Sequence, residues 1–160
     1  MDKVATPAEA APEVDLGVLN DVIGFRIRRI QNHLSRQFLE RITDTQLRPG
    51  GFSALALIAA NPGLDQTTLA RAIGFDKATV VALLDGLESL GWAERRRQTE
   101  DRRRHALFIT AEGETALARL SRIAQENEAA AHATLTEAEQ AELYRLLDKI
   151  YAACFSEPEL

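Results

Sequence analysis

Residues 65–110 restrict the fold of this chain more than any other part of the sequence. Asp65 and Asp76 can each cap a helix, which predicts one helix over residues 66–73 and a second over residues 77–90. About three residues separate the two helices, and a glycine there can leave the first helix in the left-handed conformation. The segment therefore predicts a helix-turn-helix, with its small residue, its glycine corner and its inward apolar residue at Ala70, Gly74 and Val80.

The second of these helices has two different faces. One face is a predicted buried stripe of Val80, Leu83, Leu84, Leu87 and Leu90. The other carries mostly small, uncharged side chains, which suit entry into a DNA major groove about 12 Å wide, where Thr79 could bond a base edge or a phosphate. An ordinary amphipathic surface helix is the alternative. The DNA contacts expected from the two helices are Gln66, Thr67, Thr68, Lys77, Ala78, Thr79, Val81 and Ala82.

Six arginines follow within ten residues, at positions 95–97 and 102–104. Residues 93–98 and 103–109 can pair as two strands around a short turn, with Leu107 and Ile109 facing inward. A run of charge is usually only a solvated surface, but these arginines gather on one hairpin directly after the helix-turn-helix, where their field would meet phosphates. The hairpin is therefore predicted to be a wing that contacts DNA through Arg95, Arg97, Arg102, Arg103 and Arg104.

The net charge of −5 at pH 7 argues at first against a nucleic-acid partner. Charges balance in residues 1–49, residues 50–110 carry a net charge of +1, and residues 111–160 carry −6. The acidity is thus concentrated at the C-terminal end, while the predicted wing is basic. This distribution favours DNA binding by the wing and keeps the acidic helices away from DNA.

The sequence gives little support to an enzyme or an exported protein. It contains no glycine-rich phosphate loop, no His-Glu-x-x-His motif and no nucleophile beside a base, so we expect no catalysis and no cofactor. A single cysteine, Cys154, excludes an intramolecular disulfide and fits a reducing compartment. The longest apolar run, residues 51–60, is too short to span a bilayer, and no signal peptide is evident. We therefore expect a cytoplasmic protein.

Before the helix-turn-helix, residues 1–15 have the composition of a flexible arm. Apolar residues recur every three or four positions from Leu16 onward, which predicts one dimerisation helix of about 27 residues within residues 16–46. The head, residues 47–110, is expected to begin with a helix from Pro49 to Ala60. The two glycines after Pro49 are costly in a helix start, and their missing side chains could leave room for a ligand.

After the wing, Thr110 can cap a helix over residues 111–133, and Thr136 and Glu139 form a capping box for a last helix. Residues 111–155 are thus expected to be C-terminal dimerisation helices, and residues 156–160 a tail. The last helix has the clearest apolar stripe: Leu143, Leu146, Leu147, Ile150, Tyr151 and Cys154. Such stripes exceed what a small head can cover, which predicts a homodimer. The fold class is mainly α with a small β-hairpin wing.

The order of these elements resembles the MarR family of winged helix-turn-helix transcription regulators. The segments that carry the resemblance are LRPGGFSALALI, DQTTLARAIGFDKATVVALLDGLESLGW and DRRRHALFITAEGETAL. The resemblance implies a homodimer on pseudo-palindromic double-stranded DNA. Arg102 or Arg103 would enter the minor groove, and Asp101 would hold an arginine by an ion pair, or equally brace the hairpin. Ala82 and Gly86 stand where many relatives carry longer polar or basic residues, so the recognition helix lacks long base readers.

The resemblance also implies a ligand-responsive repressor that is released by a small aromatic acid or its coenzyme A thioester. Arginines and a histidine beside an aromatic ring suit such an anion. The candidate effector-binding residues are His33, Arg36, Arg41 and Phe52, with Gly50 and Gly51 facing them. In the alternative interpretation, His33 and Arg36 are solvated and Phe52 belongs to the core.

Other sensing chemistries have less support in the sequence. Some peroxide-sensing relatives carry a reactive cysteine in the first helix, where this chain has none, and Cys154 is expected to pack within an apolar stripe. The three histidines, His33, His105 and His132, are far apart in the sequence and predict no metal site. A redox- or metal-responsive regulator of the same fold, or a helical protein-interaction module, remain the alternatives.

Overall fold

The computed structural model describes residues 14–43, 45–97 and 105–155. The chain divides into two compact units, one that ends at His33 and one that begins at Leu34. Most of the predicted arm, the wing residues Asp101, Arg102, Arg103 and Arg104, and the predicted tail lie outside the described residues. In the described part, no helix is long and apolar enough to cross a bilayer.

The single long helix predicted from Leu16 is wrong, because the chain breaks at Val22. A 3₁₀ helix, η1 (Gly17–Asp21), precedes helix α1 (Ile23–Arg41), and Val22 between them is extended, with φ −101° and ψ 98°. The carbonyl of Asn20 accepts a hydrogen bond from Nη2 of Arg26 at 2.7 Å instead of continuing a helical ladder. A side chain thus takes the acceptor that an unbroken helix would use.

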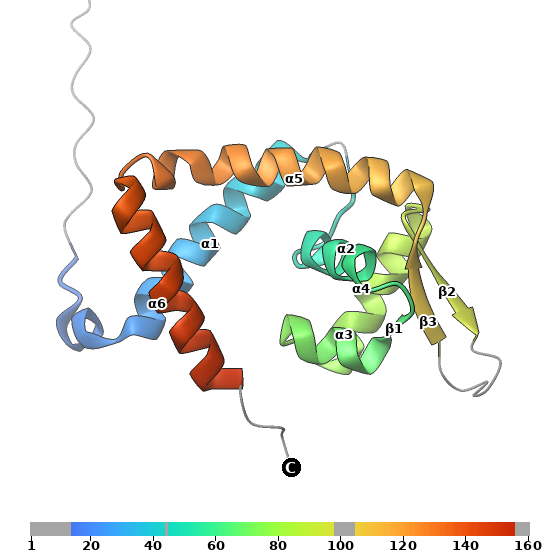
Figure 1. Ribbon diagram of the computed structural model, residues 1–160, viewed down its shortest axis with the longest axis horizontal. Coiled ribbons are helices and arrows are strands. Elements are labelled where there is room, and N and C mark those ends of the chain that lie inside the picture. The colour runs from blue at the N-terminus through green and yellow to red at the C-terminus, as the bar shows by residue number, and fades with distance from the viewer. Residues whose placement is uncertain (1–13, 44, 98–104, 156–160) are drawn as a thin grey trace, which may run out of the picture. The chain divides into compact units, whose positions relative to one another are not determined.

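The second unit holds the head and the two C-terminal helices. The head consists of α2 (Gly51–Ala60), β1 (Leu64–Asp65), α3 (Gln66–Ile73), α4 (Lys77–Ser89), β2 (Ala93–Arg97) and β3 (His105–Ile109) (Figure 1). The three strands form an antiparallel sheet in the order β1-β3-β2, in which Leu107 of β3 faces both Leu64 and Arg95. The hairpin of β2 and β3 confirms the predicted wing strands, whereas the sequence did not predict β1.

The core of the second unit joins the head to the first half of α5 (Ala111–His132). Leu120 of α5 is fully buried together with Leu55 of α2 and Leu107 of β3, and Ala116 is also buried. The predicted stripe of α4 is confirmed for Val80, Leu83, Leu84 and Leu87. Leu90 is only partly buried, because α4 ends at Ser89 and Leu90 is its C-cap. Half of α5 thus belongs to the head as well as to the C-terminal helices.

Two glycines at the start of α2 make room for the chain's own side chains. The helix begins at Gly51, not at Pro49, and Gly50 is its N-cap in the left-handed conformation at φ 84°. A Cβ on Gly50 would lie 2.5 Å from the ring of Phe75, and one on Gly51 would lie 2.5 Å from Leu47. The room that the sequence suggested for a ligand is therefore filled from within the fold.

Both predicted caps of the C-terminal helices are confirmed. Thr110 Oγ1 accepts from the amide of Gly113 at 3.0 Å and donates to the carbonyl of Gly91 at 2.6 Å, which fixes the start of α5. At the start of α6 (Glu137–Phe155), the amide of Glu139 donates to Thr136 Oγ1 at 3.3 Å, and the Glu139 carboxylate accepts from the Thr136 amide at 2.8 Å. This is the reciprocal capping box.

Candidate nucleic-acid interface

The helix-turn-helix is set by the two predicted aspartate caps and the predicted glycine corner. Asp65 Oδ1 accepts from the amides of Thr67 and Thr68 at 2.9 and 3.0 Å, and α3 ends at Ile73 with Gly74 as its C-cap at φ 75°. Asp76 Oδ1 accepts from the amide of Thr79 at 3.0 Å and begins α4. The sequence therefore encodes this corner through local hydrogen bonds, and the structure confirms it.

The Asp76 cap also restricts what Thr79 can do. The Thr79 hydroxyl donates its proton to Asp76 Oδ2, so that while this bond lasts the oxygen can only accept a hydrogen bond from DNA. A phosphate offers only acceptors, whereas base amino groups donate. Of the two partners suggested for Thr79 from the sequence, a base edge is the compatible one.

The Asp76 cap gives the fold a predictable dependence on pH. The hydrogen bonds from the side chain and amide of Thr79 lower the pKa of Asp76 below its ordinary value of 3.8. A carboxylate with a lowered pKa stabilises the fold above its unfolded-state pKa and loses this contribution as the pH falls through its folded-state pKa. Asp76→Ala should therefore lower Tm by a few degrees at pH 7, with a difference from wild type that shrinks below about pH 3.8. Thermal unfolding by circular dichroism at pH 7 to 2.5 measures this.

The control for the pH series is Asp148→Ala, which removes an exposed carboxylate within α6 that caps no helix. We expect this variant to follow the wild-type Tm across the series. A deficit in Asp76→Ala that stays constant down to pH 2.5 would contradict the role of the charged cap.

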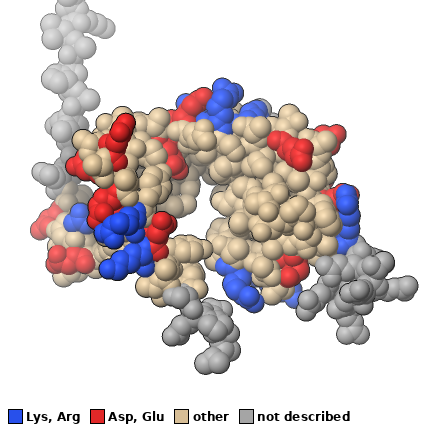
Figure 2. Space-filling model, viewed as in Figure 1, with Lys and Arg blue, Asp and Glu red and all other residues tan. Residues whose placement is uncertain are grey.

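A polar hollow of about 410 Å³ lies where α3, α4 and β3 meet. It brings together four predicted DNA contacts, Gln66, Thr67, Thr68 and Lys77. The cap residue Asp65 also lines it, as do Arg71 and His105, which the sequence analysis did not select as DNA contacts. Arg71 could have been found as an exposed basic residue on the first helix of the motif, whereas His105 is placed here only by the sheet. Figure 2 shows basic side chains at the lower edge and on the right-hand side of the head in this view.

The other predicted contacts on α4 differ in exposure. Ala78, Thr79 and Val81 are exposed, whereas Ala82 is only partly exposed. Since Val81 and Ala82 carry no hydrogen-bonding side chain, they can offer only apolar contacts, such as to a thymine methyl group. The exposed face of α4 is therefore poor in groups that distinguish bases.

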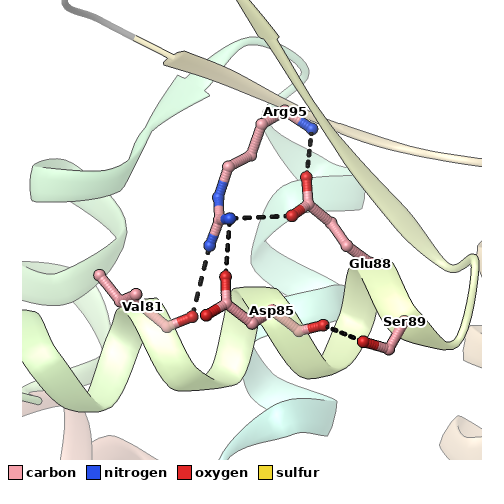
Figure 3. Close-up of polar contacts among 5 residues, drawn as sticks. All are labelled: Val81, Asp85, Glu88, Ser89 and Arg95. Atoms are coloured by element: carbon pink, nitrogen blue, oxygen red, sulfur yellow. Dashed lines mark hydrogen bonds and ion pairs between the residues drawn. The ribbon is translucent and has the colours of Figure 1, made fainter.

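The described wing arginines have different surroundings. Arg95 does not point into solvent: its Nη1 pairs with Asp85 at 2.7 Å and with Glu88 at 2.8 Å, both on α4 (Figure 3). Arg96 pairs with Glu94 and lies with its guanidinium carbon 4.3 Å from the centroid of the Phe108 ring. Arg97 lies opposite His105 where the main chains of β2 and β3 pair.

Two of the four effector candidates make contacts within the fold. Arg41 Nη1 donates to the carbonyl of Ile123 at 3.3 Å, and its Nη2 lies 3.7 Å from the carboxylate of Glu126. The ring of Phe52 packs against Phe38 with centroids 5.4 Å apart, as the core interpretation expected. His33 and Arg36 are exposed on α1. Among the described residues, no group of three or more His, Cys, Asp or Glu side chains could hold a metal ion.

Comparison with known proteins adds to this geometry. Residues 46–104 match the model of the MarR family. A transcriptional regulatory protein for the hcr operon of Thauera aromatica is 37% identical over 136 residues, which cover 84% of this chain and 82% of that protein. The chain belongs to the MarR family. The HTH-type transcriptional repressor YetL of Bacillus subtilis, another relative, is 34% identical over 113 residues, 69% of this chain and 66% of YetL.

Solved structures agree with the MarR-family assignment. The transcriptional repressor CouR bound to a 23-mer DNA duplex is 34% identical, has a TM-score of 0.76, and is matched over 88% of this chain and 99% of its own. CouR bound to p-coumaroyl-CoA is 32% identical with a TM-score of 0.74, over 87% and 98% of the two chains. This protein is therefore a MarR-family transcriptional regulator with a winged-helix fold.

Proposed function

We propose that this MarR-family regulator is a homodimeric repressor that binds a pseudo-palindromic operator and is released by an anionic aromatic compound or its coenzyme A thioester. The observation that carries the proposal is the arrangement of the head. Its polar hollow is lined by residues of α3, by the cap residue Asp65, and by Lys77 and His105, and it lies beside the arginine-bearing hairpin. Basic groups from three elements can then meet phosphates of one duplex.

Exposed apolar side chains support the dimer. The stripe predicted on α6 is open to solvent in the single chain, where Leu143, Leu147 and Ile150 are about 40% exposed and Tyr151 is 61% exposed. In the first unit, Val18, Ile23 and Ile30 are at least 60% exposed. Soluble proteins rarely leave contiguous apolar patches of this kind uncovered, so a second copy is the expected cover. Cys154 is also exposed in the single chain and would pack there.

Two heads would compensate for the modest recognition helix. With Thr79 restricted to accepting and with Val81 and Ala82 apolar, one head can distinguish few bases. A two-fold dimer places two recognition helices about one helical turn of DNA apart, and the two half-site energies combine. Specificity then depends on the spacing of the heads as well as on base contacts.

The effector part of the proposal rests on the ligand of a relative and on α1. CouR, which is 32% identical, binds p-coumaroyl-CoA. In this chain, Arg36 and His33 are exposed on α1. The helix contains five arginines and a single acidic residue, Glu40. An anionic ligand would be attracted to this helix. The ligand would release the operator to the extent that it binds the DNA-free arrangement of the protein more tightly than the DNA-bound arrangement.

The regulator interpretation is tested by gel shift on DNA upstream of the protein's own gene, over about 50 to 200 mM salt. Six or more phosphate contacts should weaken binding about 1,000-fold or more across this range. Arg102→Ala, in the predicted wing tip, should weaken binding and flatten the logarithmic salt slope by about one unit. Equal affinity for that DNA and for a random duplex would contradict the proposal.

A thermal-shift screen of aromatic acids and their coenzyme A thioesters tests the effector separately. A ligand present at about 100 times its Kd stabilises the fold by about 2.7 kcal/mol, which gives a measurable rise in Tm. Arg36→Gln should reduce the shift produced by an active anion, with Arg119→Gln on α5 as the charge-matched control. If no compound of this class raises Tm, the effector proposal fails while the DNA proposal stands.

A further inference from the structure

Arg95 connects the wing to the recognition helix through four contacts (Figure 3). Its Nη1 donates to Asp85 Oδ1 at 2.7 Å and to Glu88 Oε2 at 2.8 Å, and its Nη2 donates to the carbonyl of Val81 at 3.3 Å. The main-chain amide of Arg95 donates to Glu88 Oε1 at 2.9 Å. One residue of strand β2 is thus held to one face of α4 over about two helical turns.

The side chain of Arg95 is enclosed, unlike that of the next residue. Arg95 is 21% exposed, and its Nε is buried without a hydrogen-bond partner among the described residues. Arg96, in contrast, is 59% exposed, and its contacts with Glu94 and Phe108 both remain within the hairpin. A phosphate-binding arginine must present free N–H groups to the duplex, whereas those of Arg95 are turned toward α4.

The contacts also fix an edge of the sheet. In the strand order β1-β3-β2, β2 is an edge strand, and the Arg95 amide is occupied by the Glu88 carboxylate. Glu88 therefore binds both the main chain and the guanidinium of the same residue. Such a two-point attachment restricts rotation of the hairpin about the end of α4, which a single flexible ion pair would not do.

We propose that Arg95 is a positioning residue for DNA binding and not a phosphate contact. It holds the hairpin at the angle to α4 at which wing and recognition helix can contact the same duplex together. The proposal rests on the function proposed above, and it replaces the direct contact that the sequence suggested for Arg95. Because α4 has few base-reading side chains, preference for the operator depends on how these few are placed against the bases. Loss of this angle should therefore weaken binding to the operator more than binding to random DNA.

The two carboxylates make the proposal testable by the sign of an effect. Asp85 and Glu88 lie on the helix that would enter the groove, and a carboxylate near phosphates opposes binding. If charge alone mattered, Glu88→Gln would tighten DNA binding. If Glu88 acts by holding Arg95, the same substitution weakens operator binding, because glutamine offers one acceptor oxygen where the carboxylate uses two.

The experiment compares dissociation constants for the operator and a random duplex, over a salt series, for wild type, Arg95→Gln, Arg95→Lys, Glu88→Gln, Arg95→Gln/Glu88→Gln and the neighbour control Arg96→Gln. We expect Arg95→Gln to weaken operator binding about tenfold or more, with a salt slope changed by less than about half a unit. Arg95→Lys should not restore binding, since an ammonium cannot bridge the same acceptors. Glu88→Gln should weaken operator binding, and the double variant should resemble Arg95→Gln.

Three results would overturn the positioning role. The first is a logarithmic salt slope of operator binding reduced by about 0.9 in Arg95→Gln, which marks a lost phosphate contact. The others are wild-type operator affinity in Arg95→Lys and tighter operator binding by Glu88→Gln. If Arg95→Gln does not fold by circular dichroism, the Glu88→Gln and Arg95→Lys variants decide by the same criteria. A wild type that does not prefer the operator over random DNA would contradict the regulator proposal itself, which separates the two failures.

Discussion

Replacing Leu147 and Ile150 of α6 by glutamate is expected to weaken operator binding by about 100- to 10,000-fold. The substitution should separate the dimer, so that DNA is bound by one head instead of two linked heads. Joining two binding modules raises affinity by this range without any new contact. Both side chains are exposed on α6 in the single chain, so the substitution should leave the head folded. Size-exclusion chromatography with light scattering should show a monomer, and gel shift measures the loss of affinity.

Lys149→Glu is the matched control for the α6 variant. It changes the net charge of the same helix by −2, as the double substitution does, but Lys149 lies between the two stripe positions in the sequence and outside the stripe. We expect Lys149→Glu to remain dimeric and to bind the operator within a few-fold of wild type. A monomeric Leu147→Glu/Ile150→Glu variant with wild-type affinity would exclude the two-headed mode of binding.

Gly113→Ala and Gly86→Ala are expected to change stability in opposite directions, although both glycines are helical. A Cβ on Gly113 would overlap the carbonyl oxygen of Trp92 and lie 2.8 Å from Cγ1 of Ile109. That carbonyl accepts the amide of Thr110 at 3.1 Å, so relief of the overlap would disturb the junction of β2, β3 and α5. We expect Gly113→Ala to cost about 1–3 kcal/mol of unfolding free energy, the usual range for overpacking.

Gly86 provides the control because a Cβ there would meet nothing within 4 Å. Alanine favours a helix over glycine by up to about 1 kcal/mol, so Gly86→Ala should stabilise α4 by about that amount. Urea unfolding at one fixed protein concentration measures both variants, since the stability of a dimer depends on concentration. Equal effects of the two substitutions would contradict the close approach of Trp92 to Gly113.

Local signals in the sequence predicted much of the head. The caps at Asp65, Asp76 and Thr110 and the corner at Gly74 each depend on hydrogen bonds that span two to four residues. Such contacts can be read from residue type and spacing alone. The family resemblance then agreed with the helices and the hairpin that these signals outlined.

What the sequence did not predict depends on contacts that residue type and spacing do not specify. Strand β1 has two residues and exists because Leu64 pairs with Leu107 of β3. The break at Val22 accompanies the bond from Arg26 to the carbonyl of Asn20, and the apolar periodicity continues across it. The missing side chain of Gly50 leaves room for Phe75, in the turn between α3 and α4, and not for a ligand.

The orientation of Arg95 is the clearest case for the candidate site. In the sequence, Arg95 and Arg96 are equivalent members of one basic run, but strand alternation turns one toward α4 and the other toward Phe108. The carboxylates at Asp85 and Glu88 were visible in the sequence as acidic residues on the predicted DNA-reading helix. Carboxylates on a helix that meets phosphates oppose binding, so their presence there was a signal that favoured a basic partner nearby.

The most direct test of two-headed reading is to insert five base pairs between the two halves of the operator once gel shift has located it. Half a helical turn places the second half-site on the opposite face of the duplex, where the second head of a dimer cannot reach it without distorting the DNA. We predict that affinity falls about 100-fold or more, and that inserting ten base pairs weakens binding less than inserting five. Unchanged affinity for the five-base-pair insertion would contradict the account.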